Sequence, residues 1–73
     1  MRTPSKETIN RLRNEYPVGA IVELIRMDDP QAPEPGTLGK VVMVDDVGTI
    51  HVHWNNGSSL GVAYGEDLCR RVG

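Results

Sequence analysis

The amino-acid sequence predicts a mainly β protein, a small five-stranded barrel with one α-helix at its N-terminus. Residues 49–54 alternate between apolar and polar side chains, the pattern of a strand with one buried face. Asn56-Gly57 follows directly and suits a tight hairpin of type I′, because both residues tolerate the positive φ that this turn requires. Short strands, tight turns and one long early loop favour a closed barrel, since closure removes exposed strand edges.

The expected helix occupies the first part of the chain. Thr3 or Ser5 can cap its N-terminus. Ile9, Leu12 and Tyr16 form one narrow apolar stripe, and a proline at position 17 ends the helix. We therefore divide the chain into a helical segment, residues 1–17, that packs on a barrel formed by residues 18–73. The five strands are expected at residues 20–27, 39–45, 49–54, 58–64 and 69–72.

Size and composition narrow the class of protein. The chain has 73 residues, enough for one small domain, and a single cysteine, so no intramolecular disulfide is possible. No apolar run approaches the roughly 18 residues of a membrane-spanning helix, and the N-terminus lacks an apolar signal core. A cytoplasmic location is the expectation.

The net charge of −2 is unevenly distributed. Residues 28–67 hold seven acidic side chains and one lysine, whereas both ends of the chain are basic. A nucleic-acid-binding protein normally presents a basic surface to the phosphates. The acidic middle disfavours this role and leaves only the basic ends as nucleic-acid contacts. The candidate residues are Arg11, Arg13, Arg70 and Arg71.

The residues as a whole resemble a known family. The chain is similar, over about residues 11–72, to the small bacterial proteins grouped as domain of unknown function 4314. The residues that carry this resemblance include Tyr16-Pro17-Val18-Gly19, Met27-Asp28-Asp29-Pro30, Ile50-His51-Val52, Trp54 and Asn56-Gly57-Ser58-Ser59-Leu60. The resemblance implies an SH3-like barrel and a place in conjugative elements, phages and related mobile DNA. It implies no activity, substrate or cofactor.

A second, weaker resemblance concerns a shorter segment. The pattern from Val22 through Gly36, Gly39 and Lys40 to Val44 is similar to the KOW motif of ribosomal and transcription-elongation proteins. This likeness supports the barrel. It also keeps open an alternative function as a nucleic-acid- or ribosome-associated accessory protein.

The proline-rich loop at residues 28–36 is the expected binding surface. Three prolines in six residues stiffen the segment toward polyproline geometry, and loops on a rigid scaffold often carry binding residues. In SH3-like barrels, aromatic side chains beside the long first loop commonly form peptide grooves. The candidate surface is Asp28, Asp29, Pro30, Pro33, Pro35, Trp54 and Tyr64. Trp54 is expected first of all in the core, and its place in a groove beside Tyr64 is the alternative.

No catalytic or metal-binding constellation is evident. His51 and His53 share one strand face, but a metal site needs further ligands, for which only Asp45 or Asp46 is near. Cys69 has no histidine close in sequence and is expected to be a buried structural thiol. The sequence therefore predicts neither an enzyme nor a resident metal or cofactor. It predicts a protein-interaction module that binds an unidentified protein or peptide, and the resemblance implies an accessory protein of a bacterial mobile element.

Overall fold

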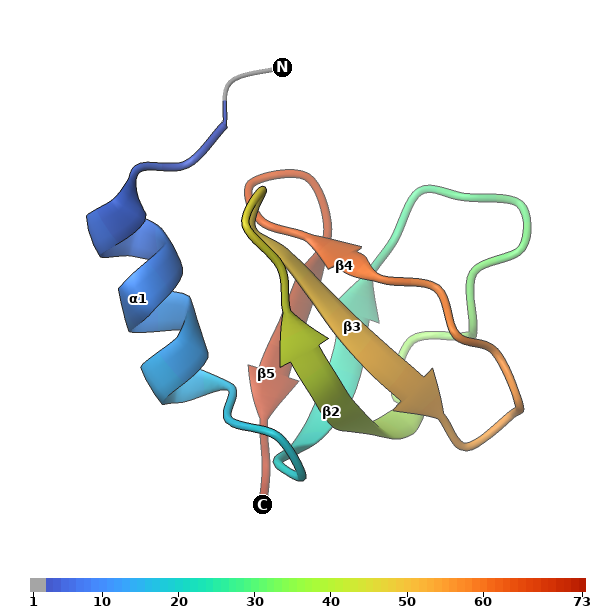
Figure 1. Ribbon diagram of the computed structural model, residues 1–73. Helices are drawn as coiled ribbons and strands as arrows, with labels where there is room; N and C mark the ends of the chain where they lie inside the picture. Colours follow the sequence, from blue (N-terminus) through green and yellow to red (C-terminus); the bar gives the residue numbers. More distant parts are fainter. Residues whose placement is uncertain (1–2) are drawn as a thin grey trace.

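The computed structural model describes residues 3–73, which form one α-helix and a single five-stranded sheet (Figure 1). The elements are α1 (Lys6–Glu15), β1 (Ile21–Arg26), β2 (Leu38–Val44), β3 (Thr49–Trp54), β4 (Val62–Ala63) and β5 (Leu68–Arg71). Neighbouring strands are antiparallel in the order β4-β3-β2-β1-β5. The predicted mainly β class with an N-terminal helix is confirmed. The sheet is not closed, because β4 and β5 remain its two edges.

Local capping defines both ends of α1. The Ser5 side chain accepts a hydrogen bond from the Thr8 backbone N–H, one of the donors that the first helical turn leaves without a partner. At the other end the Tyr16 N–H donates to the Leu12 carbonyl at 2.8 Å, and Pro17 follows. The helix buries Ile9 and Leu12, and Leu12 joins the core of the sheet. The helix therefore packs against the sheet through its apolar stripe.

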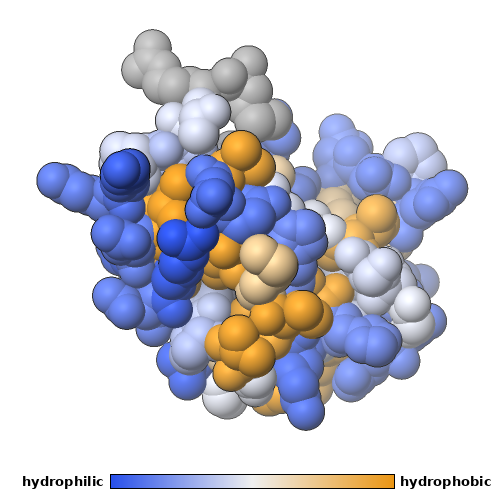
Figure 2. All heavy atoms as spheres, viewed as in Figure 1, coloured by the Kyte–Doolittle hydropathy of each residue, from blue (hydrophilic) through white to orange (hydrophobic). Residues whose placement is uncertain are grey.

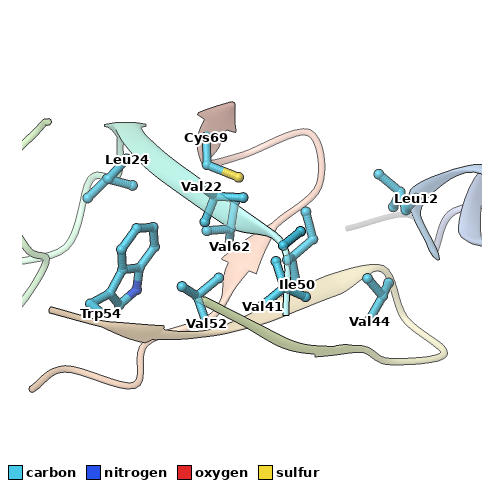
Figure 3. Close-up of a cluster of buried hydrophobic side chains, with 11 residues drawn as sticks. Leu12, Val22, Leu24, Val41, Val44, Ile50, Val52, Trp54, Val62 and Cys69 are labelled. Atoms are coloured by element: carbon cyan, nitrogen blue, oxygen red, sulfur yellow. The ribbon is translucent and has the colours of Figure 1, made fainter. Parts of the chain in front are cut away.

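The core lies on the concave side of the sheet. Alternate residues of β1, β2 and β3 point into it, as the period of two along a strand requires. Figure 3 shows these side chains converging, with Leu12 reaching them from α1 and Cys69 from β5. A bulge between Val41 and Met43 interrupts the alternation in β2, so that Val42 and Met43 are both exposed.

The hairpin at Asn56-Gly57 differs from the type I′ turn predicted. Among the described residues only glycines have a positive φ, and Gly57 has φ 91° while Asn56 does not share this conformation. The Gly57 N–H donates to the Trp54 carbonyl, and the Trp54 N–H donates to the Ser58 carbonyl. This is the three-residue hairpin in which a turn is followed by one left-handed residue. The β2–β3 hairpin is closed by the same pattern: the Asp45 N–H donates to the Thr49 carbonyl, and the Gly48 N–H donates to the Asp45 carbonyl. The positions of both turns were predicted correctly, but the type I′ predicted for Asn56-Gly57 was wrong.

Strand β4 is much shorter than the predicted strand at residues 58–64, because residues 55–61 curve around the Trp54 ring. The indole Nε1–H donates to the Leu60 carbonyl at 2.9 Å. The Ser58 and Leu60 N–H groups bond to the side chains of Asn56 and Ser58 instead of to a neighbouring strand. These local bonds compete with the β ladder, so pairing with β3 is confined to Val62 and Ala63.

Several apolar side chains remain exposed on the outer face. Figure 2 shows an apolar patch over β2 and the connection between α1 and β1, beside a mostly hydrophilic α1. The exposed apolar side chains of β2 and this connection, which we call the β2 patch, include Val18, Val42 and Met43. Across residues 3–73, no helix is long and apolar enough to span a membrane.

Candidate functional site

One of several surface concavities of similar volume is a groove between α1, the turn that joins β4 to β5, and β5. We call it the α1–β5 groove. Its volume is about 390 Å³, within the range of small ligand and peptide-anchor pockets. It is lined by Leu12, Glu15, Tyr16, Arg26, Ile50, Val62, Tyr64, Gly65, Asp67, Leu68 and Cys69. Ile50, Val62 and Cys69 are buried and form the floor, whereas Tyr64 and Leu68 are 45% and 51% exposed on the wall. The groove thus combines a fixed apolar floor with accessible apolar walls.

Tyr64 is held in place by α1. The Arg11 guanidinium donates a hydrogen bond to the Tyr64 hydroxyl at 2.9 Å and lies 5.9 Å from the centre of its ring. Arg11 also lies 3.9 Å from the Glu15 carboxylate, one helical turn further along α1. These contacts tie the helix to the β4–β5 turn across one end of the groove. The groove therefore has a defined shape although two of its walls come from distant parts of the chain.

The thiol in the floor is not poised as a nucleophile. Burial raises the pKa of Cys69 to about 11, although a hydrogen bond with Tyr16 opposes the shift. The pKa of Tyr16 is raised as well, first by burial and then by the nearby Cys69 and Glu15. Because the thiolate is the reactive form of cysteine, little of the Cys69 side chain is reactive at neutral pH. The predicted buried state of Cys69 is confirmed, since its side chain belongs to the core.

Two residues of the predicted binding surface are buried instead. Trp54 is only 1% exposed, and its ring fills the core beneath β3 (Figure 3). Pro33 is also buried. A partner cannot reach either side chain, so placing them on a binding surface was wrong. Tyr64 is exposed, but it faces α1 and does not form a groove with Trp54. The alternation that places Trp54 on the inner face of its strand decides this.

The rest of the proline-rich loop is exposed, as expected. Asp28, Asp29, Pro30 and Pro35 all face solvent. Local bonds order the segment: the Asp29 carboxylate accepts from the Gln31 N–H, and Gly36 and Thr37 bond to Leu24 of β1. The loop does not line the α1–β5 groove, but it begins directly after β1, whose Arg26 does.

The four arginines proposed as nucleic-acid contacts are engaged within the molecule. Arg13 lies 2.7 Å from Asp46, and Arg70 lies 2.8 Å from Glu23. Arg11 contacts Tyr64 and Glu15, and Arg71 donates to the Gly73 and Glu15 carbonyls. These arginines come from different elements, α1 and β5, and three have carboxylate partners. The basic ends of the sequence therefore do not combine into one unpaired basic surface.

Asp45 organises the β2–β3 hairpin. Its carboxylate accepts hydrogen bonds from the Val47 and Thr49 N–H groups and from His51 Nε2–H, the last at 2.8 Å. His51 is thus engaged with a turn carboxylate, and no group of three or more metal-ligating side chains occurs in residues 3–73. His51 and Asp45 therefore stabilise the hairpin, whereas the His53 side chain is exposed.

Acid is expected to weaken this hairpin. Burial raises the pKa of Asp45, but the bonds from His51, Thr49 and Val47 together outweigh it, so the pKa lies below its ordinary value of 3.8. A depressed carboxyl pKa stabilises the fold above the ordinary value, and this contribution is lost as the pH falls through the depressed one. Thermal unfolding followed by circular dichroism should therefore show a falling Tm at acid pH. The fall should be smaller in Asp45→Asn, and an identical pH profile for the two proteins would contradict the role of Asp45.

The sequence did not reveal the groove itself. Tyr16 and Leu12 were expected to pack the helix on the barrel, with a partner-binding helix as the alternative, and Leu68 and Arg26 were not singled out. Nothing in their spacing shows that α1 lies beside the β4–β5 turn, because the residues that line the groove come from five separate segments. The sequence holds one local signal of the groove: the apolar side chains of Tyr64 and Leu68 flank the turn at Gly65.

Comparison with known proteins gives one result. Searches of curated proteins and of solved structures found no significant match. The sequence profile of one protein family, described as Domain of unknown function (DUF4314), matches residues 5–72, nearly the whole chain. The earlier resemblance is therefore confirmed, and the chain belongs to the DUF4314 family.

Proposed function

We propose that this protein is a non-enzymatic protein-interaction module, and that the α1–β5 groove is its binding surface. The observation that carries the proposal is the groove itself, about 390 Å³ in volume, with Tyr64 and Leu68 exposed on its walls. Exposed apolar side chains beside a preformed concavity are typical of sites that take an anchor side chain of a partner. The proposal transfers the expected binding surface from the proline-rich loop to the groove next to it.

The chemistry of the groove supports binding rather than catalysis. Its one thiol has a raised pKa and lies in the floor, and its tyrosine Tyr64 is occupied by Arg11. Nucleophilic catalysis needs a nucleophile within hydrogen-bond reach of a base that activates it. Tyr16 beside Cys69 does not meet this need, because its own pKa is raised.

The same proposal includes the type of fold and the biological role of the protein. We infer that the curved sheet is an SH3-like barrel with an open seam between β4 and β5. Support comes from the bonds across the β4–β5 turn, where the Ala63 carbonyl accepts from the Asp67 N–H and the Asp67 carboxylate accepts from the Ala63 N–H. The DUF4314 resemblance suggests an accessory protein of a bacterial mobile element, and the composition of the chain suggests a cytoplasmic location.

A role on nucleic acid has weaker support, because the candidate arginines are engaged with carboxylates or carbonyls. A salt titration separates the two functions. We expect no binding of short duplex DNA or single-stranded RNA even at low salt, measured by fluorescence anisotropy. Phosphate contacts strengthen as salt falls, so tight binding at low salt that weakens steeply with added salt would favour the nucleic-acid role instead.

Two matched substitutions test the groove directly. Leu68→Asp places a charge on the groove wall, and Val42→Asp places the same charge on the β2 patch; the two side chains are 51% and 52% exposed. Proteins captured from the native cell by the wild-type chain are identified, purified and titrated against the wild-type chain and both variants by calorimetry. We expect Leu68→Asp to weaken the purified complex at least about tenfold and Val42→Asp to leave it unchanged, since a groove-wall anchor is a hot spot and a remote surface residue is not.

If Val42→Asp weakens the complex and Leu68→Asp does not, the binding surface lies on the β2 patch and the proposed site is overturned. Circular dichroism of both variants gives the control for folding. Equal melting temperatures, together with unequal binding, separate an effect on the groove from an effect on stability.

A further inference from the structure

The charges around the α1–β5 groove are unbalanced in a way that the net charge of −2 conceals. Ion pairs neutralise the arginines on the other faces, where Arg13 meets Asp46 and Arg70 meets Glu23. On the helix side of the groove, Arg11 is paired with Glu15. These three pairs neutralise three of the cations that a partner would otherwise meet.

The carboxylates at the other end of the groove lack such partners. Asp67 lines the groove and Glu66 precedes it in the same turn, while Asp28 and Asp29 follow β1. Arg26 of β1 pairs in register with Leu68 of β5, so the residues just beyond Arg26 and just before Leu68 lie at the same end of this ladder. None of the ion pairs found within residues 3–73 involves these four carboxylates.

The positive charge that faces them is small. Arg26 is the one cation that lines the groove among the described residues. Asp67 of the lining, together with the neighbouring Glu66, Asp28 and Asp29, gives this end a negative potential, which attracts cationic partners over about 8 Å at physiological salt. The groove walls are apolar at Tyr64 and Leu68, so the nearest part of a partner must be apolar.

We infer that the groove binds a peptide segment with an apolar anchor side chain flanked by lysines or arginines. The anchor occupies the space between Tyr64 and Leu68, and the basic flank lies over Glu66, Asp67 and the start of the proline-rich loop. This inference rests on the proposed function and names the chemistry of its partner. It also gives the acidic loop at residues 28–36 a role, which is to attract the basic flank rather than to form the pocket.

A charge-balanced random library of short peptides, displayed on phage, tests the inference. Peptides selected on the wild-type chain are expected to be basic on average and to carry a leucine-sized or aromatic residue. Their affinity, measured by calorimetry with synthetic peptides, should fall with added salt as the Debye length shrinks from about 30 Å to about 8 Å. Leu68→Asp should abolish the binding, whereas Val42→Asp should not.

Three charge variants locate the basic flank. Glu66→Gln should weaken the selected peptides about twofold to fivefold, as expected for an exposed rim charge. The matched control Glu7→Gln removes the same charge from the first turn of α1, away from the groove lining, and should have no effect. Arg26→Gln removes the opposing cation and should tighten the binding.

The outcomes distinguish this inference from the proposed function. Selected peptides that are neutral or acidic, but still lose binding with Leu68→Asp, would overturn the basic partner and leave the groove as the binding surface. Peptides unaffected by Leu68→Asp, or a library that yields no binder, would overturn both. Equal effects of Glu66→Gln and Glu7→Gln would show that only net charge matters and would overturn the placement of the basic flank.

Discussion

Trp54→Ala is expected to remove a large part of the free energy of unfolding, more than any other single substitution considered for this protein. The ring is 1% exposed and its Nε1–H bonds to the Leu60 carbonyl, so truncation removes both a large apolar contact and a buried hydrogen bond. Removing a buried large aromatic side chain costs about 3–5 kcal/mol. The free energy of unfolding of a domain this small is about 4–11 kcal/mol, at 0.05–0.15 kcal/mol per residue. Urea unfolding followed by circular dichroism measures the loss.

Trp54→Phe is the matched control for this substitution. It keeps most of the aromatic packing and loses the hydrogen bond, which leaves the Leu60 carbonyl without its indole donor. The expected loss in the free energy of unfolding is about 1–3 kcal/mol, smaller than for alanine. A Trp54→Ala protein as stable as the wild type would contradict the buried position of the ring and would restore Trp54 as a surface residue.

Gly39→Ala is expected to have the second largest effect on stability. Gly39 of β2 lies across from β3, and a Cβ atom there would lie 2.5 Å from Val52 Cγ1, 2.7 Å from Trp54 Cε3 and 3.0 Å from the His53 carbonyl oxygen. The backbone oxygen and the buried ring cannot move away without disturbing the core. Overpacking of this kind costs about 1–3 kcal/mol and occasionally more, even though the substitution of glycine by alanine otherwise restricts the unfolded chain favourably.

Lys40→Ala is the control, because Lys40 is the next residue of the same strand and its side chain is exposed on the opposite face. Its effect should stay within about 0.5 kcal/mol. Urea unfolding of both variants gives the comparison. If Gly39→Ala were as stable as Lys40→Ala, then β2 and the Trp54 ring would not be in the close contact that the structure shows.

Features that depend on neighbouring residues were predicted well. The alternation in residues 49–54 places Ile50, Val52 and Trp54 on the buried face, and the structure agrees. The ends of α1 follow from Ser5 as a cap and from the proline after Tyr16, because both act on the backbone within one turn. The type of the Asn56-Gly57 turn was missed, since Asn tolerates but does not require a positive φ.

The candidate site was predicted less well, because its parts meet only in the folded chain. Trp54 and Tyr64 both end alternating runs in the sequence, and both are aromatic. Residues 55–61 fold over Trp54 and bury it, whereas Tyr64 is left at the turn beside Arg11, which lies 53 residues away in sequence. Spacing alone does not distinguish these two aromatic side chains.

Local sequence determines the positions of β1, β2, β3 and β5, the inner face of β3, the positions of the turns and the limits of the helix. Each of these depends on backbone preferences and side-chain periods within a few residues. The groove, the pairing of the arginines and the unpaired acidic end depend instead on contacts between residues 33 to 53 positions apart, such as Arg13 with Asp46, Arg70 with Glu23 and Arg11 with Tyr64. Tertiary structure decides these contacts, because they depend on which segments the sheet order and the packing of α1 bring together.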